Sequence, residues 1–308
     1  MILAASGQAA WSQAARTIRL IVPYQAGAAV DILARLLGEQ IGRTHGPTVV
    51  VENRPGGGSV IGTEAVARAA PDGNTLLISV SDFVITPHLR KLSYSALTSF
   101  EPVCYLVDLP LLLVVNSASP YRTLADLLNA ARARPGDLTL AASGPATAYH
   151  IAFETLRRAA KVDMTFVPYP GTAPAVTAVM GDHVTSYLGS YAAVMEQLGS
   201  GKLRALATPS KARLEPLPDV PTVSESGVAD YEAVNWIAVF APAKTAKETV
   251  ARLAGWFAAA MDAPEVKAKL AVQGLLPAIK CGADFAAFVK KEYEAYGLAV
   301  REANIRTE

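Results

Sequence analysis

The clearest pattern near the start of the chain is a short apolar run followed by apolar residues at helical spacing. Ile18–Val22 is rich in β-branched residues, and Pro23 ends the run. From Ile32 to Ile41, apolar residues recur every three or four positions, which indicates one buried helix face. Residues 25–29, between these segments, carry little side-chain bulk. The pattern predicts a strand, a small-residue loop and a helix, an arrangement that presents backbone N–H groups to an anion.

Apolar runs and helical stripes alternate through the rest of the chain. Further strands are expected at residues 48–52, 75–80, 111–116, 138–143, 164–169, 185–188, 203–208 and 233–240. Helices are expected at residues 60–70, 123–134, 245–261, 264–273 and 283–303. Strands separated by helices form parallel sheets that are covered on both faces. The strands are too many for one compact sheet, so we expect two α/β lobes with parallel-dominated sheets flanked by helices.

The chain is expected to cross between these lobes twice. The first crossing is placed near residues 104–109, and the return lies in the aperiodic, Pro-rich region 217–231. The first lobe is then discontinuous and comprises residues 15–105 and 225–308, whereas residues 106–224 form the second lobe. Ligands of such sheets bind at the carboxyl ends of the strands, which places the expected site in the cleft between the lobes.

The first residues have a composition of their own. Residues 1–14 resemble the end of a secretory signal peptide, because small residues dominate and Ser12-Gln13-Ala14 fits the small-x-small cleavage rule. The basic start of a signal peptide is missing, and an ordinary disordered N-terminus is the alternative. We interpret residues 1–14 as a signal-peptide remnant, which implies a mature protein that begins near Ala15 and lies outside the cytoplasm.

Composition and charge exclude several classes of partner. The chain has 308 residues, enough for two domains of ordinary size. Its net charge is +1, from 28 basic and 27 acidic residues, so no overall field attracts nucleic acid or an anionic membrane. No uncharged apolar run approaches the roughly 20 residues that a spanning helix needs.

The two cysteines, Cys104 and Cys281, lie far apart in the sequence. A disulfide is possible in an oxidising compartment, but the sequence cannot establish that their Cα atoms lie within bridging distance. Two separate buried thiols are the preferred interpretation.

Motifs typical of enzymes and metal sites are absent from the sequence. There is no G-x-S-x-G, G-x-x-x-x-G-K-[ST] or H-E-x-x-H, and the glycine cluster at residues 54–59 does not fit G-x-G-x-x-G. His45, His88, His150 and His183 lack the spacing of metal ligands. We therefore expect no cofactor, no metal and no catalytic residues.

Three loops, the first one included, share this design. They are Pro23–Asp31, Ser143–Thr147 and Tyr169–Pro174, and each joins the carboxyl end of an expected strand to a helix. Each supplies unbonded N–H donors and one or two hydroxyl or phenol groups. Loops from both lobes are expected to close on a ligand carboxylate. In the alternative interpretation, Gly and Pro simply mark connections between strands and helices.

Four segments carry a resemblance to a known family: VPYQAGAAVDILARLL, VVVENRPGGGSVIGTEAVARAAPDGNTLL, FVPYPGTAPAVTAVMGDHV and GKLRALATPSKARLEPLPDVPTVSESG. They resemble the Bug-type receptors of tripartite tricarboxylate transporters in both pattern and order. The resemblance implies a two-lobed, type II periplasmic-binding-protein fold without catalysis. It also implies a carboxylate held mainly by backbone amides and bridging waters, delivery to integral-membrane permease subunits, and a periplasmic protein that we expect to be monomeric.

The resemblance holds at some positions of each loop and fails at others. In the first loop, Tyr24, Gly27 and Asp31 match the family pattern, whereas Gln25 and Ala28 depart from it. The second loop matches at Ser143, Gly144 and His150, and the third at Tyr169, Gly171, Ala173 and Pro174. The complete ligand-binding set that we expect is Tyr24, Gln25, Gly27, Ala28, Asp31, Ser79, Asp82, Ser143, Thr147, Ala148, His150, Tyr169, Gly171, Thr172, Ala173 and Tyr191.

Asp82 bears most directly on the identity of the ligand, because the family has small residues at this position. It follows the expected strand at residues 75–80, where it could receive a ligand ammonium or hydroxyl group. The preferred alternative is that its side chain caps the segment that follows. Aromatic side chains near the loops suit a dicarboxylate or an aromatic carboxylate.

Two other functions share these features. An enzyme could use the same cleft, with Asp31, Asp82 and His150 as acid–base groups, and a receptor could signal to a membrane sensor kinase instead of feeding a transporter. The preferred interpretation is an extracytoplasmic receptor that captures a small carboxylate for a tripartite transporter.

Overall fold

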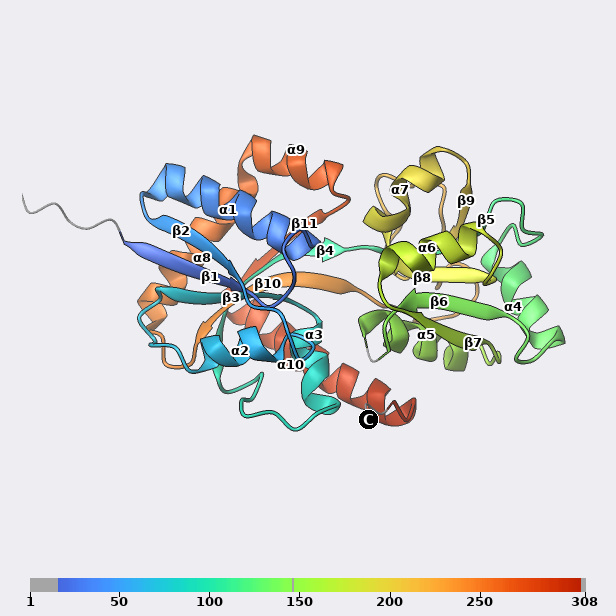
Figure 1. Ribbon diagram of the computed structural model, residues 1–308, viewed down its shortest axis with the longest axis horizontal. Coiled ribbons are helices and arrows are strands. Elements are labelled where there is room, and N and C mark those ends of the chain that lie inside the picture. Colours follow the sequence, from blue (N-terminus) through green and yellow to red (C-terminus); the bar gives the residue numbers. More distant parts are fainter. Residues whose placement is uncertain (1–15, 146, 306–308) are drawn as a thin grey trace, which may run out of the picture.

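The computed structural model describes residues 16–145 and 147–305. Figure 1 shows two lobes side by side, each formed by one sheet with helices on both of its faces. The predicted signal-peptide remnant, residues 1–14, lies outside the described residues. No helix in the described ranges has the length and apolar character needed to cross a bilayer.

The first sheet takes its strands from both ends of the chain. Its order is β11-β4-β10-β3-β1-β2. The strands are β1 (Thr17–Val22), β2 (Thr48–Asn53), β3 (Thr75–Val80), β4 (Phe100–Leu109), β10 (Asn235–Pro242) and β11 (Leu276–Cys281). Strand β1 pairs in parallel with β2 and β3, whereas β10 is antiparallel to both β3 and β4.

The second sheet is formed by one continuous stretch of the chain, in the order β7-β6-β8-β5-β9. Its strands are β5 (Leu111–Asn116), β6 (Thr139–Ser143), β7 (Thr165–Tyr169), β8 (Ser186–Ser190) and β9 (Leu203–Ala207). Only Pro110 separates β4 of the first sheet from β5 of the second, and β10 carries the chain back. Figure 1 shows the chain running between the two lobes at the ends of β4 and β10.

Helices cover both faces of each sheet because the central strands are apolar on both sides; every residue of β10, for example, is buried. On the first sheet, α1 (Ala29–His45), α8 (Lys247–Asp262) and α9 (Pro264–Val272) share one core, and α2 (Val60–Ala67), α3 (Asp82–Ile85) and α10 (Gly282–Glu302) share the other. A single 3-10 turn, η1 (Thr86–His88), follows α3. On the second sheet, α4 (Leu124–Ala133) and α5 (Ala148–Ala159) lie on one face, and α6 (Thr172–Met180) and α7 (Tyr191–Gly199) lie on the other.

The sheets are mixed, which refines the prediction of parallel-dominated sheets. Parallel pairing holds around β1 and around β6, where helices connect neighbouring strands as expected. The crossing strands β4, β5 and β10 pair antiparallel with their neighbours. Strands β4 and β11 were not predicted as strands, because their pairing is with segments distant in the sequence.

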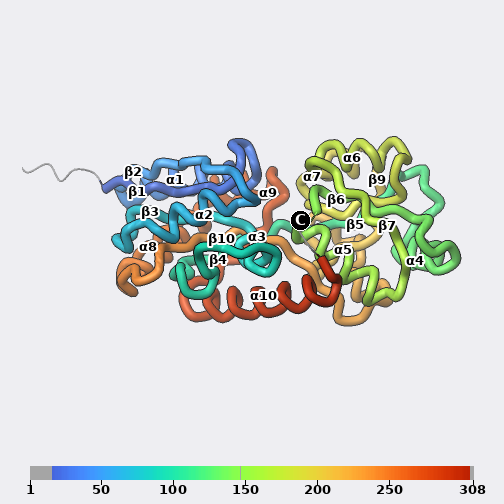
Figure 2. Tube along the Cα trace, turned by 60° about the horizontal axis from the view of Figure 1, so that its bottom comes forward, coloured from blue at the N-terminus to red at the C-terminus, as the bar shows by residue number. Residues whose placement is uncertain are grey.

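The last helix, α10, reaches from the first lobe to the second. Its C-terminal part packs with Ala148 and Ile151 of α5, and Arg158 of α5 lies 3.1 Å from Glu302. Figure 2 shows α10 running along one side of the molecule toward α5. The lobes are therefore in contact beside the crossing strands as well as through them.

Cys104 and Cys281 form a disulfide, with their Cα atoms 4.2 Å apart. The prediction of two separate buried thiols is wrong. Strand β11 returns beside β4, and the two cysteines are direct partners in that antiparallel pairing. Because β11 was not predicted, its pairing with β4, which brings the two cysteines together, was not predicted either.

Candidate functional site

A cavity of about 220 Å³ lies where the two lobes meet, at the carboxyl ends of strands in both sheets. Its lining combines predicted and unpredicted residues. The lining residues are Tyr24, Ala28, Ala29, Val30, Val80, Asp82, Leu109, Ser143, Thr147, Ala148, Tyr149 and Asn235. The structure thus brings the first and second predicted loops together from opposite lobes.

Two helices begin at this cavity. The first turn of α1 contributes Ala29 and Val30, and the backbone N–H groups of both residues have no acceptor among the described residues. Helix α5 contributes Ala148 and Tyr149, whose backbone N–H groups also have no acceptor among the described residues. Unbonded N–H groups and the positive ends of two helix dipoles favour a negatively charged ligand group. The cavity can therefore bind a carboxylate without a basic side chain.

Thr147 fixes the start of α5. Its hydroxyl accepts a hydrogen bond from the His150 backbone N–H at 3.4 Å and lies 3.1 Å from the carbonyl oxygen of Ser143, to which it donates. This N-cap holds the second loop against the helix that follows it. The predicted loop geometry is present, with the threonine acting as a cap at the edge of the cavity.

Asp31 holds the first loop in place through hydrogen bonds of its carboxylate. One carboxylate oxygen accepts hydrogen bonds from the Gly27 N–H at 2.9 Å and from Arg35 at 3.1 Å, and the other accepts from the Asn53 amide at 2.9 Å. Burial alone would raise the pKa of Asp31, but these hydrogen bonds outweigh it and hold the pKa below its usual value. Asp31 is buried and does not line the cavity, so it positions the loop instead of facing a ligand.

Asp82 lines the cavity, and it differs from Asp31 in its hydrogen bonds and in the direction of its pKa shift. Its carboxylate has no hydrogen-bond or ion-pair partner within the described part of the chain, and burial raises its pKa to about 6. The preferred interpretation that Asp82 caps the next segment is wrong. Ser81 occupies the cap position of α3, and no side chain caps this short helix.

Tyr24 forms one wall of the site, and Ser79, which does not line the cavity, contacts it. The Tyr24 hydroxyl lies 3.3 Å from the buried Ser79 hydroxyl, so Ser79 supports Tyr24 from behind. Burial, and then the negative charge of Asp82, raises the pKa of Tyr24 far above its usual value. Tyr24 therefore remains protonated and serves as a neutral hydrogen-bonding wall.

The sequence interpretation missed Asn235 and left Tyr149 out of the ligand-binding set. The Asn235 side-chain oxygen accepts hydrogen bonds from the Ser81 hydroxyl at 2.7 Å and from the Trp236 N–H at 2.9 Å. Its amide nitrogen then points toward Tyr149, with 3.5 Å to the phenol oxygen, across the boundary between the lobes. Asn235 opens the returning strand β10, so its position depends on a long-range crossing that no local pattern reveals.

Several predicted residues do not line the cavity. Gln25 and Gly27 are exposed on the first loop, and Ala173 is exposed on the third. His150 stacks on Phe166, with ring centroids 4.1 Å apart, and lies 3.9 Å from Glu154. The enzyme alternative needed Asp31, Asp82 and His150 together, but only Asp82 reaches the cavity.

The third loop and Tyr191 do not line the cavity. The Tyr169 carbonyl oxygen accepts a hydrogen bond from the Gly144 N–H at 2.9 Å, and Gly171 caps α6 through its backbone. Thr172 begins α6 and does not line the cavity. The Tyr191 N–H donates to Pro110, and its buried side chain packs beside Gly274 of the other lobe. A direct ligand contact for these residues remains a prediction.

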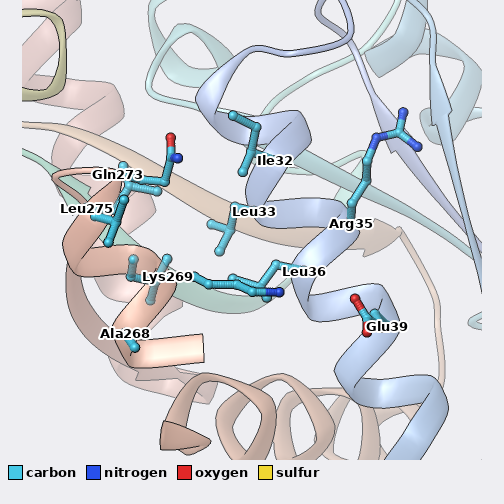
Figure 3. A pocket seen from close by; sticks show the side chains of 11 residues that line it. Ile32, Leu33, Arg35, Leu36, Glu39, Ala268, Lys269, Gln273 and Leu275 are labelled. Carbon is cyan, nitrogen blue, oxygen red and sulfur yellow. The ribbon is translucent and has the colours of Figure 1, made fainter. Parts of the chain in front are cut away.

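A second, apolar groove of about 480 Å³ lies on the outside of the first lobe, between α1 and α9. Figure 3 shows Ile32 and Leu36 of α1 facing the side chains of α9 across it. None of the predicted site residues lines this groove. No cluster of His, Cys, Asp and Glu suitable for a metal occurs within residues 16–145 and 147–305.

The sequence and the fold are similar to those of known proteins. Residues 33–305 match the model of the tripartite tricarboxylate transporter family receptor, TctC. The chain belongs to this family. Protein BugT of Bordetella pertussis (strain Tohama I) is 34% identical over 295 residues, which cover 95% of this chain and 90% of BugT.

Solved structures of related proteins share the fold of this receptor. The periplasmic binding protein BugD is 32% identical, with a TM-score of 0.79 over 95% of this chain and 99% of BugD. An R. palustris protein solved with adipate is 30% identical, with a TM-score of 0.82 over 96% of this chain and 99% of that protein. The receptor therefore has the type II periplasmic-binding-protein fold. It is a periplasmic solute-binding protein and not an enzyme.

Proposed function

We propose that this receptor binds a small carboxylate between its lobes and delivers it to the integral-membrane permease subunits of a tripartite transporter. The observation that carries the proposal is the meeting of two helix N-termini at one cavity, each with unbonded N–H groups. Hydrogen bonds from such groups to a charged acceptor are worth about 1.5–3 kcal/mol each. They give affinity for a carboxylate where the lining has no basic side chain.

The size and walls of the cavity support a dicarboxylate or an aromatic carboxylate. A volume of about 220 Å³ fits a small molecule, and Tyr24 and Tyr149 supply flat, partly apolar walls. The relative solved with adipate is consistent with a dicarboxylic acid in this kind of site. We further propose that the receptor acts as a monomer, with one discontinuous lobe formed by the two end segments of the chain and a second lobe formed by its middle segment.

The first step of the test is a ligand screen by thermal unfolding. Mono-, di- and tricarboxylates, aromatic acids and amino acids are added to the full chain, and hits are confirmed by calorimetry. A ligand at 100 times its Kd adds about 2.7 kcal/mol to the free energy of unfolding. A screen in which no carboxylate shifts the transition contradicts the proposed function.

The second step compares two helix caps. Thr147 caps α5 at the cavity, and Thr123 caps α4 on the far side of the same lobe through a capping box with Asp126. Each Thr→Val variant loses a cap worth about 1 kcal/mol. We expect only Thr147→Val to weaken binding of the confirmed ligand, by about tenfold, or roughly 1.4 kcal/mol. If Thr147→Val and Thr123→Val bound the confirmed ligand with equal affinity, the ligand would not bind at the N-terminus of α5.

A further inference from the structure

Asp82 is an unpaired carboxylate in a cavity that otherwise favours anions. Besides tyrosines, it is the one ionisable residue in the described lining, and no Lys, Arg or His reaches the cavity. Its carboxylate has no partner among the described residues, and it does not cap α3. A partly buried charge without a partner costs free energy, so its retention in a binding cavity calls for a function.

The polar neighbours of Asp82 are engaged with one another. The Tyr24 hydroxyl pairs with Ser79, and the Asn235 oxygen accepts from Ser81 while its amide nitrogen faces Tyr149. These groups can therefore line the cavity without neutralising Asp82. With its pKa at about 6, Asp82 is mostly ionised at neutral pH.

The charges in the cavity select between classes of carboxylate. The N-termini of α1 and α5 attract one carboxylate group of a ligand. A ligand group near Asp82 meets a negative charge, which repels a second carboxylate and attracts a cation. A plain monocarboxylate leaves Asp82 unpaired. A molecule with a carboxylate and an ammonium group satisfies both parts of the cavity.

We propose that the ligand is an amino-substituted carboxylate, whose carboxylate binds at the two helix N-termini and whose ammonium group is received by Asp82. This inference rests on the proposed function and narrows its ligand class. Asp82 is then the residue that determines specificity, and it separates this receptor from a site for plain dicarboxylates. The dicarboxylate and aromatic classes remain compatible, provided that the molecule also carries an amino group.

The test uses pairs of probes that differ only in the amino group. The pairs are L-aspartate and succinate, L-glutamate and glutarate, L-phenylalanine and 3-phenylpropionate, and β-alanine and propionate. Calorimetry measures their affinities for the parent protein, Asp82→Asn and Asp82→Glu. We expect the amino member of at least one pair to bind the parent at least about tenfold more tightly than its partner, the ratio typical of a charge-assisted hydrogen bond.

The Asp82→Asn variant should lose this preference, and Asp82→Glu should keep part of it. Asp108→Asn is the matched control, because Asp108 is also a half-buried carboxylate with a pKa raised by burial, but its partner is Tyr105 and it lies outside the cavity lining. That control should keep the parent's preference. Thermal unfolding confirms that each variant is folded.

The outcomes separate the inference from the proposed function. If the parent binds the amino-free member of each pair as tightly as the amino member, the ammonium proposal is overturned and the proposed carboxylate receptor stands. The same holds if the parent takes up a proton when it binds the amino-free member, because Asp82 is then neutralised by the proton and not by an ammonium group. The proposal is equally overturned if Asp82→Asn keeps the parent's preference. If no member of any pair binds but the thermal screen finds another carboxylate without an amino group, the inference is overturned and the proposed function stands. If no carboxylate of the screen binds, both fall.

Discussion

Two aspartates near the same loop show how local contacts decide the role of a residue. Asp31 accepts hydrogen bonds from Gly27, Arg35 and Asn53, which hold its pKa below the usual value. Asp82 receives no such bonds, and burial raises its pKa to about 6. The Asp31 carboxylate holds the loop in place, whereas the Asp82 carboxylate is available to a ligand. Sequence position alone could not distinguish them, because both follow a strand of the same sheet.

The raised pKa of Asp82 has a consequence for stability. The pKa of the Asp82 carboxyl rises on folding from 3.8 to about 6. Its contribution to the free energy of unfolding is therefore fully present below about pH 4 and is lost as the pH rises through 6. We therefore expect Asp82→Asn to raise the free energy of unfolding at pH 7 by roughly 1–3 kcal/mol, and by much less at pH 4. Urea unfolding of both proteins at the two pH values measures this. A gain that does not change with pH argues against a burial effect.

At the scale of elements, α2 supports the first loop through a close contact. A Cβ atom on Gly62 would lie 2.8 Å from the carbonyl oxygen of Arg54 and 2.9 Å from Cβ of Pro23, where the loop begins. We expect Gly62→Ala to lower the free energy of unfolding by about 1–3 kcal/mol and to weaken ligand binding, because the helix would push the loop away. Chemical denaturation and calorimetry measure the two effects.

Gly255 provides the matched control for this change. It is an exposed residue inside α8, and a Cβ atom there would have no neighbour within 4 Å. Gly255→Ala should raise the free energy of unfolding by about 0.5–1 kcal/mol, because alanine is the better helix former, and should leave binding unchanged. If Gly62→Ala behaved like this control, the close contact would not support the loop.

Elements with a local signal were predictable from the sequence, and elements fixed by distant pairing were not. The apolar run of β1, the capping box of Thr123 and the small-residue loops are local patterns, and the structure has all of them. Strand β11 contains Pro277 and is largely exposed, so no apolar alternation marks it. Asn235 reaches the cavity only because β10 returns between β3 and β4. The site could thus be predicted in its loops, but not in the part that the crossing strand supplies.

At the scale of the whole molecule, the disulfide closes a segment that contains the entire second sheet. It joins residues 177 positions apart in the sequence. Cross-links of long loops stabilise folded proteins by about 2–5 kcal/mol, chiefly by restricting the unfolded chain. We expect the double variant Cys104→Ser with Cys281→Ser to lose stability of this order, as measured by urea unfolding. The chain has 2 cysteines, so a reductant should destabilise the parent and leave the double variant unaffected.

The two lobes are expected to hinge about the crossing strands. Loops from both lobes line the cavity, so a ligand that bridges them shifts the population toward a closed form, by no more than its differential affinity for that form. Small-angle scattering should show a smaller radius of gyration once a ligand confirmed by calorimetry is added to ligand-free protein. An unchanged profile would contradict closure while leaving the binding site intact. At the same ligand concentration, the Thr147→Val variant should show a smaller decrease in the radius of gyration.

The insertion of one sheet within the other also sets an order of events during synthesis and export. All strands of the second sheet lie between Leu111 and Ala207, whereas the first sheet waits for β10 and β11 near the end of the chain. Domains fold as units as the chain emerges, from the N-terminus onward. The second lobe can therefore fold while β3 and β4 of the first lobe still lack β10, the strand that lies between them. The lobe that begins first is completed last, and the edges of its apolar strands β3 and β4 stay unpaired in the meantime.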